Sequence, residues 1–457
     1  MSTENISDIE TSKKVDHLCV LVHGLWGKPS HLDFIAEVLR EQYGEDRLYT
    51  LCAAENSGNF TYDGIEVGGE RVVREVEDTL EKLEAQGQKI TKISVVGYSL
   101  GGLIARYAIG LLQAHGWLDR VEPMNFTTFA SPHVGVRTPA KGMGTNIWNG
   151  LGPRMVSMSG QQMFMVDTFR DTGRPLLSLL ADPESIFIQG LKRFKNRSVY
   201  GNIVNDRITV PYTTLFSKVD PFRDLEKINI NYVEGYEQTI VNPDEWLLPL
   251  EPKESESCGE EKLNRLKNFR QNLPFYLAIL LLAPPATTIF TIYSIIQTCR
   301  SQKRIRLHLE GKNGLLFQKY RVPLLVQDMQ HVVDEIVENT NALQEPAYLS
   351  SSDTQESDSS DSRTSKVLKA VKWRRRSSAS SQPLSIGKTA SEFPKLALTP
   401  EQIAIIDSLD AVGFRKYPVH IHNDRHSHAV IIRRDKKTEN DEGIHVMRHW
   451  INNGFAI

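Results

Sequence analysis

The chain has 457 residues, of which 40% are hydrophobic, so it can bury a substantial core and is long enough for two or three domains. Its formal net charge is -2 at pH 7, so no general electrostatic attraction to nucleic acid or to anionic lipid is expected. The four cysteines are scattered and the polar first 14 residues contain no apolar signal core. We therefore expect a protein that starts in the cytosol, with residues 1–14 disordered.

Short apolar segments alternate with helical ones along the first part of the chain. The segments typical of strands are 18–22, 47–54, 92–99 and 124–132, and those with helical periodicity are 30–43, 68–87 and 100–116. The strand segments are apolar throughout, which is typical of a parallel sheet covered on both faces. We therefore expect an α/β protein whose mostly parallel sheet has helices on both faces.

The rest of the chain divides by composition. We expect the core to extend over residues 15–250, with an insertion of helices and loops at 135–195 and a further strand that ends near Asp206. The Ser/Asp-rich residues 345–400 predict a disordered linker. A compact C-terminal part, residues 401–457, contains the strand-like "KYPVHIH".

Residues 273–297, within a charged segment at 253–310, contain no charged side chain and have basic groups on both sides. The run is long enough to span a bilayer, but Pro284 and Pro285 lie in its middle and are expected to break a helix into two arms. Both flanks are basic, so neither side is favoured for translocation. We expect a hairpin that dips into one leaflet, with a buried helix pair and a single span as the alternatives.

The segment "VVGYSLGG", residues 95–102, contains the pattern G-x-S-x-G around Ser99, between a predicted strand and a predicted helix. The glycines allow a sharp turn that exposes the serine Oγ. The amide of Leu100 at the helix start then points to where an oxyanion would form. The segment "HGLWG" follows the first strand, and its Leu25 amide is expected as the second donor, with Trp26 as the alternative. His23 is expected to be structural.

A nucleophilic serine needs an acid and a base later in the chain. Asp206 is the best acid because it ends a strand-like run, and Asp220 in "KVDPF" is the alternative. Eight histidines follow: His308, His331, His420, His422, His426, His428, His445 and His449. Their irregular spacing matches no zinc pattern, so we expect chemistry without a metal or cofactor. His428 and His449 are the leading candidates for the base, and His133 and Asn146 are weak candidates for substrate contact.

Several motifs in this order resemble the "putative serine esterase" family of α/β-hydrolase lipases, whose fungal members include a lipid-droplet phospholipase. They are "LVHGLWG", "NFTYDGIEVGGERVVREV", "VVGYSLGGLIARYAIG", "FASPHVGV", "SHAVIIRR" and "HWINNGF". The resemblance covers roughly residues 15–235 and 410–457. It implies an α/β-hydrolase fold with a lid-like insertion, Asp206 as the acid, and the histidine of "SHAVIIRR", His428, as the base.

The resemblance and the motifs together predict a serine lipid acyl hydrolase. Ser99, Asp206 and His428 would be its catalytic residues, and Leu25 and Leu100 would supply its oxyanion hole. We expect it to cleave glycerophospholipid esters on the cytosolic face of a lipid droplet or the endoplasmic reticulum, bound through residues 273–297. The alternatives are a neutral glyceride (monoacylglycerol) lipase, an acyltransferase, or a membrane tether with a silent hydrolase fold.

Overall fold

The computed structural model describes residues 15–136, 157–206, 209–236, 238–249, 273–311, 320, 393, 396–435 and 442–457. The disorder expected for residues 1–14 and for most of 345–400 therefore concerns segments outside the described residues. The same holds for residues 137–156 of the expected insertion, including Asn146.

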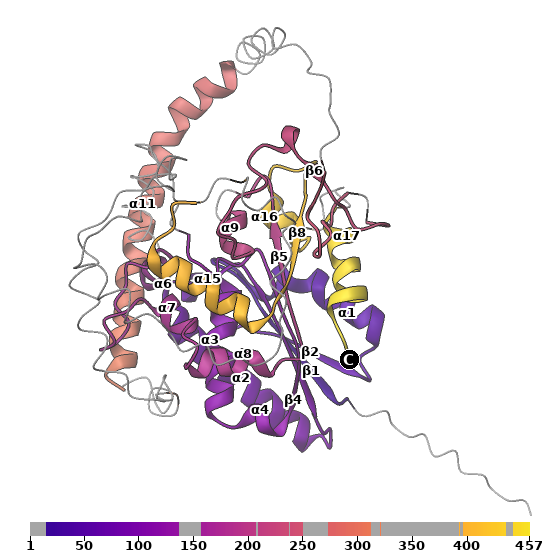
Figure 1. Cartoon of the computed structure of the whole chain (residues 1–457). Helices are drawn as coiled ribbons and strands as arrows, with labels where there is room; N and C mark the ends of the chain where they lie inside the picture. The colour runs from indigo at the N-terminus through magenta and orange to yellow at the C-terminus, as the bar shows by residue number, and fades with distance from the viewer. Residues whose placement is uncertain are drawn as a thin grey trace, which may run out of the picture.

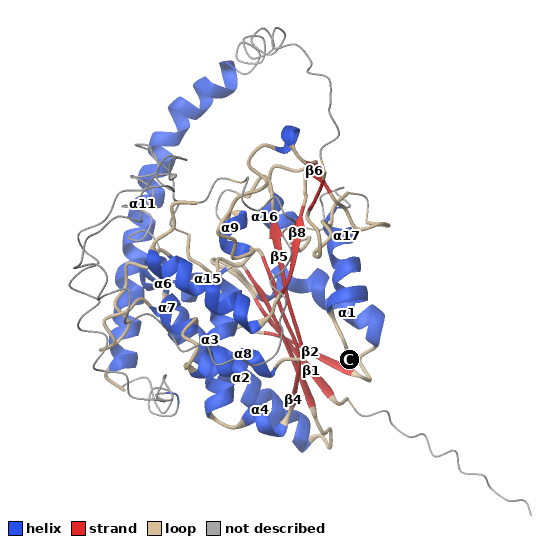
Figure 2. Cartoon of the chain, in the orientation of Figure 1, coloured by secondary structure: helices blue, strands red, loops and turns tan. Residues whose placement is uncertain are grey.

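The central feature is a six-stranded sheet in the order β2-β1-β3-β4-β5-β8 (Figure 2). Its strands are β1 (His17–Val22), β2 (Leu48–Cys52), β3 (Lys92–Tyr98), β4 (Glu122–Phe129), β5 (Asn196–Asn202) and β8 (Arg415–Val419). Each neighbouring pair is parallel. The parallel sheet expected from the continuous apolar segments is therefore confirmed. A separate antiparallel pair joins β6 (Asn229–Ile230) to β7 (Leu247–Leu248).

Helices cover both faces of the sheet (Figure 1). The α-helices are α1 (Asp33–Tyr43), α2 (Ile65–Ala85), α3 (Leu100–Ala114), α4 (Trp117–Arg120), α6 (Ser157–Met163), α7 (Leu176–Leu180), α8 (Ile186–Arg193), α9 (Pro211–Thr214), α11 (Leu273–Leu309), α15 (Pro400–Val412), α16 (Ser427–Val430) and α17 (Glu442–His449). Short helical turns are η1 (Pro29–Leu32), η2 (Gly58–Tyr62), η3 (Leu225–Lys227) and the π-helical η4 (Trp450–Gly454). This arrangement is the α/β-hydrolase fold that the resemblance implies.

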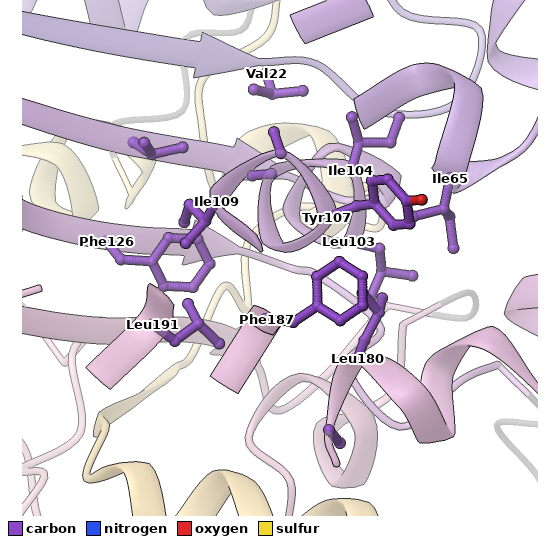
Figure 3. Packing of buried hydrophobic residues seen from close by; sticks show 14 of the residues in the cluster. Val22, Ile65, Leu103, Ile104, Tyr107, Ile109, Phe126, Leu180, Phe187 and Leu191 are labelled. Carbon is purple, nitrogen blue, oxygen red and sulfur yellow. The ribbon is translucent and has the colours of Figure 1, made fainter. Parts of the chain in front are cut away.

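The alternation of side chains along β1 divides the core into two layers. Leu18, Val20 and Val22 pack with α2, α3, α7, α8 and α15, whereas Cys19 and Leu21 pack with α1, α17 and η4. Figure 3 shows part of the first layer, where Phe187 of α8 lies beside Tyr107 of α3 with their ring centroids 5.0 Å apart. Both faces of each central strand are thereby removed from water, which explains why these strands are apolar throughout.

The C-terminal part of the chain completes the sheet. Strand β8 pairs with β5, with Ser198 opposite Arg415 and Asn202 opposite Val419. Helix α15 begins with a capping box in which the side chains of Thr399 and Gln402 bond each other's backbone amides. The last residues therefore fold back onto the core, and this return brings a distant histidine to the carboxyl ends of the strands.

The predicted hairpin at residues 273–297 is wrong, because these residues lie in one continuous helix, α11. A proline within a helix removes one backbone hydrogen bond and bends the axis, but it does not have to end the helix. Pro284 and Pro285 are therefore compatible with a single helix. Within the part of the chain that the structure describes, no helix is both long enough and apolar enough to cross a membrane.

Candidate active site

Ser99 occupies the turn between β3 and α3 with φ 54° and ψ -128°, a conformation that non-glycine residues rarely adopt. The turn is tight because neighbouring glycines allow the backbones to approach. A Cβ on Gly101 would lie 2.1 Å from the carbonyl oxygen of Val22 at the end of β1. Strain of this kind is typical of a functional position, and here it sets the serine between β3 and the first turn of α3.

His428 of α16 provides the nitrogen that faces the serine. Its Nε2 lies 3.0 Å from the Ser99 Oγ. The hydroxyl of Tyr98, the residue before the serine, donates to the His428 carbonyl at 2.7 Å, and the two rings pack with centroids 5.2 Å apart. The last residue of the strand before Ser99 therefore contacts both the backbone and the ring of His428.

Asp206 lies four residues beyond the end of β5, and its Oδ2 is 2.8 Å from the Nδ1 of His428. It also accepts hydrogen bonds from the amide of Thr209 at 2.9 Å, the hydroxyl of Thr209 at 2.8 Å and the side-chain nitrogen of Asn202 at 3.1 Å. Burial raises the pKa of this carboxyl, but the hydrogen bond and charge of His428, with the other donors, outweigh that effect. The pKa of Asp206 is therefore below its ordinary value.

An ionised Asp206 selects one tautomer of His428. When Nδ1 carries the proton and donates it to Asp206, Nε2 has a free lone pair that can accept the Ser99 hydroxyl proton. The structure thus brings together all three residues that the sequence analysis selected as nucleophile, acid and base.

Three further hydrogen bonds, made by two side chains, join the acid and base segments. Asn205, in a left-handed conformation with φ 61°, donates to the carbonyls of Ile421 and Asp424 at 3.2 and 3.1 Å. The hydroxyl of Ser427 donates to the carbonyl of Val204 at 2.9 Å. Sequence reasoning missed these positioning residues, as it missed Tyr98 and Thr209. The "ND" pair at 205–206 is the one local signal that could have indicated Asn205.

The loop after β1 lies directly against the serine. A Cβ on Gly24 would lie 2.7 Å from the Ser99 Cβ and 3.2 Å from its Oγ, which is too close for any residue but glycine. The Gly27 amide donates to the Gly24 carbonyl at 3.0 Å, and the His23 Nδ1 lies 3.1 Å from the same oxygen. His23 is fully buried, and burial lowers the pKa of its imidazole. This geometry fits the structural role expected for His23.

The two candidate loop amides differ in their surroundings. The Trp26 amide donates to the Thr61 hydroxyl at 3.1 Å, so the alternative donor is already engaged. Leu25 follows Gly24 by one peptide bond. Leu100 is the first residue of α3, where backbone amides have no acceptor within the helix and the helix dipole favours negative charge. Leu25 and Leu100 therefore remain the predicted oxyanion donors.

The other residues that the sequence analysis considered for the site have different hydrogen-bond partners. Asp220 accepts a hydrogen bond from the Phe222 amide, and His449 lies among aromatic rings with its Nδ1 3.0 Å from the Tyr200 hydroxyl. His133 is fully buried and bonds Thr128. Among the described residues, no group of three or more His, Cys, Asp or Glu could hold a metal ion.

A strained serine after a central strand, a histidine bonded to it and a buried carboxylate bonded to that histidine form the arrangement that serine hydrolases use in their active sites. Residues 12–219 match the model of a family described as "Putative serine esterase (DUF676)". The family resemblance drawn from the motifs is thereby confirmed for this part of the chain. Ser99, Leu25, Leu100 and Asp206 lie within the matched range, and His428 lies beyond it.

Curated fungal relatives carry lipase names. "Putative lipase ROG1" of Saccharomyces cerevisiae is 32% identical over 225 residues, which are 48% of this chain and 31% of the relative. "Putative lipase C4A8.10" of Schizosaccharomyces pombe is 29% identical over 221 residues, which are 47% of this chain and 28% of the relative. The matched part of this chain thus covers less than a third of the length of these two relatives.

Solved structures of esterases and lipases also match, with low scores. Carboxyl esterase 2 from Tuber melanosporum is 15% identical with a TM-score of 0.28, covering 45% of this chain and 71% of that one. Phospholipase PlaB from Legionella pneumophila is 10% identical with a TM-score of 0.27, covering 44% of this chain and 42% of that one. At such scores these likenesses add nothing to the fold, which rests on the sheet itself.

Proposed function

We propose that the protein is a serine carboxylic-ester hydrolase that cleaves fatty-acyl esters of glycerophospholipids at a membrane or lipid-droplet surface. The observation that carries the proposal is the continuous row of hydrogen bonds from Ser99 Oγ through His428 to Asp206, at 3.0 and 2.8 Å. A serine with only a structural role does not require hydrogen bonds to a histidine that is itself bonded to a carboxylate. Acyl transfer to serine does require a nucleophile, a base and an acid in this arrangement.

The first half of the reaction forms an acyl-enzyme. The Ser99 Oγ attacks the ester carbonyl carbon while the His428 Nε2 takes the hydroxyl proton. The carbonyl oxygen becomes an oxyanion that the Leu25 and Leu100 amides stabilise. As the tetrahedral intermediate collapses, the bond to the alcohol breaks, and His428 returns the proton to the leaving oxygen.

The second half releases the fatty acid. His428 takes a proton from water, the hydroxide oxygen attacks the acyl carbon, and the new intermediate collapses to free acid and Ser99 with its proton restored. Asp206 holds the imidazole in the required tautomer and stabilises its protonated form in both halves. An acyltransferase would use the same residues with a lipid hydroxyl in place of water.

Two features support a lipid substrate at a surface. The curated relatives are named lipases, and α11 includes the uncharged apolar segment 273–297. A helix of this composition favours contact with lipid, and the proposed location is the cytosolic face of a lipid droplet or of the endoplasmic reticulum.

Turnover of separate lipid classes tests the proposal. The purified full chain is given phospholipid, triacylglycerol or monoacylglycerol in dispersed form, and free fatty acid and transferred acyl product are measured separately. We expect fatty acid from phospholipid, with Ser99→Ala and His428→Ala inactive. Turnover of glycerides alone, or transfer without free acid, would replace the proposed reaction by one of its alternatives. If the folded protein turns over none of these lipids, the proposal that it is an enzyme is contradicted.

A further inference from the structure

At residues 292–297, α11 has polar side chains toward the protein and isoleucines toward the outside. Ser294, Gln297, Ser301 and His308 recur at helical spacing on the side that faces the core, and all are buried. On the opposite side, Ile292, Ile295 and Ile296 are 54%, 57% and 45% exposed. A surface helix in water normally has the reverse arrangement, so the outward side of this helix matches an apolar medium.

Specific polar contacts fix this orientation. The Ser301 hydroxyl donates to Asp63 at 2.8 Å, and the Arg304 guanidinium binds both oxygens of the same carboxylate at 2.6 to 3.0 Å. The Asp63 side chain is almost completely buried and also pairs with Arg71 at 2.7 Å. One turn further along, His308 lies 2.9 Å from buried Glu70. Rotating α11 to bury its isoleucines would remove Ser301 and Arg304 from the buried Asp63 carboxylate and His308 from buried Glu70, which is strongly unfavourable.

The helix is attached beside the candidate active site. Asp63 directly follows η2. Within η2, the Thr61 hydroxyl accepts a hydrogen bond from the backbone amide of Trp26, which belongs to the loop that lies against Ser99. The side chains of Trp26 and Phe60 are themselves 47% and 46% exposed, and Phe60 lies 5.0 Å from the Arg304 guanidinium. In Figure 1, α11 runs along the left edge of the molecule, and its N-terminal half extends upward beyond the core.

The distribution of charge along α11 indicates what kind of surface its apolar side contacts. Residues 273–309 contain no Asp or Glu, and four basic residues follow the apolar segment at positions 300, 303, 304 and 306. Arg300 and Lys303 are exposed. An apolar segment that ends in a basic cluster is the pattern that binds anionic lipid headgroups. Two copies of this helix packed in parallel would bring their basic clusters together, so the charge favours an anionic surface over that pairing.

We propose that the outer face of α11, defined by Ile292, Ile295 and Ile296, docks on a phospholipid surface that contains anionic headgroups. The isoleucines enter the acyl region, while Arg300 and Lys303 contact headgroup phosphates. This docking brings the loop of Trp26 and the serine behind it toward the lipid. The inference rests on the proposed function for its purpose, but its test does not depend on catalysis.

Flotation with vesicles tests the docking. The full chain is mixed with phosphatidylcholine vesicles with and without phosphatidylserine, at low and high salt. We expect stronger binding with phosphatidylserine, weakened by salt. The triple variant Ile292→Ser/Ile295→Ser/Ile296→Ser is expected to bind at least about tenfold more weakly. The control Ile403→Ser, which changes an isoleucine of α15 that is 39% exposed, is expected to bind like the wild type.

A charge variant isolates the headgroup contact. Arg300→Glu/Lys303→Glu is expected to remove the preference for phosphatidylserine, while Lys227→Glu, at another exposed lysine, is expected to keep it. A triple variant that floats like the wild type would overturn the proposal. So would a wild-type dimer that the triple variant converts to monomer, because the outer face would then bind a second copy.

Catalysis is measured separately with a water-soluble short-chain ester. The triple variant is expected to hydrolyse this ester like the wild type, while its turnover of vesicle phospholipid falls about as much as its binding. Equal loss on both substrates would show damage to the site itself and would overturn docking as the role of this face. An inactive wild type that still binds vesicles would contradict the proposed function and leave the docking supported.

Discussion

Replacing Asp206 by asparagine tests the arrangement of the site most sharply. Both carboxylate oxygens act only as acceptors, of bonds from His428, Thr209 and Asn202. An amide of the same shape has one acceptor and one donor. If its oxygen stays on the Thr209 amide, its nitrogen faces the His428 Nδ1. The imidazole must then accept there and carry its proton on Nε2, where it cannot act as a base toward Ser99.

The expected loss follows from this change of tautomer. In serine hydrolases the exchange lowers kcat on the order of 10³- to 10⁴-fold, which corresponds to about 4 to 5 kcal/mol of transition-state stabilisation. The buried amide also faces the Asn202 and Thr209 donors, so the free energy of unfolding should fall by about 1–3 kcal/mol. KM should change little, because Asp206 does not contact the substrate in the proposed mechanism.

Steady-state kinetics on a soluble short-chain ester, with thermal unfolding to check the fold, measure both quantities. The matched control is Asp220→Asn, at the alternative acid, which is expected to keep kcat within about twofold. A folded Asp206→Asn variant with kcat within tenfold of the wild type would refute the reasoning. An Asp220→Asn variant that loses activity instead would transfer the role of the acid to Asp220.

Substitutions at three further residues distinguish residues that position the catalytic groups from residues that only stabilise the fold. Burial lowers the pKa of His449 to about 4, so below pH 6.5 the unfolded chain binds more protons, and stability falls as the pH falls. Between pH 7 and 4.5, His449→Asn should reduce this loss of unfolding free energy by about 2–3 kcal/mol, measured by urea unfolding, and should keep kcat within about twofold. If the stabilities of variant and wild type change in parallel with pH, this reasoning is contradicted. Thr61→Val, which removes the hydroxyl that holds the Trp26 amide, should lower kcat by about 10- to 100-fold at similar KM, and Thr61→Ser should restore it; a serine variant as slow as the valine variant would contradict positioning by the hydroxyl. Tyr98→Phe, which removes the bond to the His428 carbonyl, should lower kcat about tenfold in a folded protein, and unchanged kcat would remove Tyr98 from the positioning residues.

The sequence indicated the sheet and the nucleophile because both depend on local pattern. Ser99 lies between a buried strand and a helix, and glycines at fixed offsets allow the turn. The choice of His428 among eight later histidines came from the family resemblance. No local sequence pattern shows which of these histidines lies near Ser99 once β8 has joined the sheet and α16 has packed beside it.

The structure departs most from expectation at α11. Hydropathy marked the apolar segment, but it could not determine whether two prolines end a helix or bend it. Periodicity also leaves open which side of a helix turns inward. That choice depends on Asp63, more than two hundred residues earlier in the chain, whose buried charge requires Arg304 and Ser301. The positioning residues Tyr98, Asn205 and Thr209 depend on similar long-range contacts.

Reaction with a fluorophosphonate tests the central claim most directly, because such a probe phosphonylates only an activated serine. The folded wild-type chain should form one adduct, located by mass spectrometry on the peptide that contains Ser99. Ser99→Ala should form none, and His428→Ala should react far more slowly. A folded wild type that stays unlabelled, or an adduct on another serine, would contradict the account.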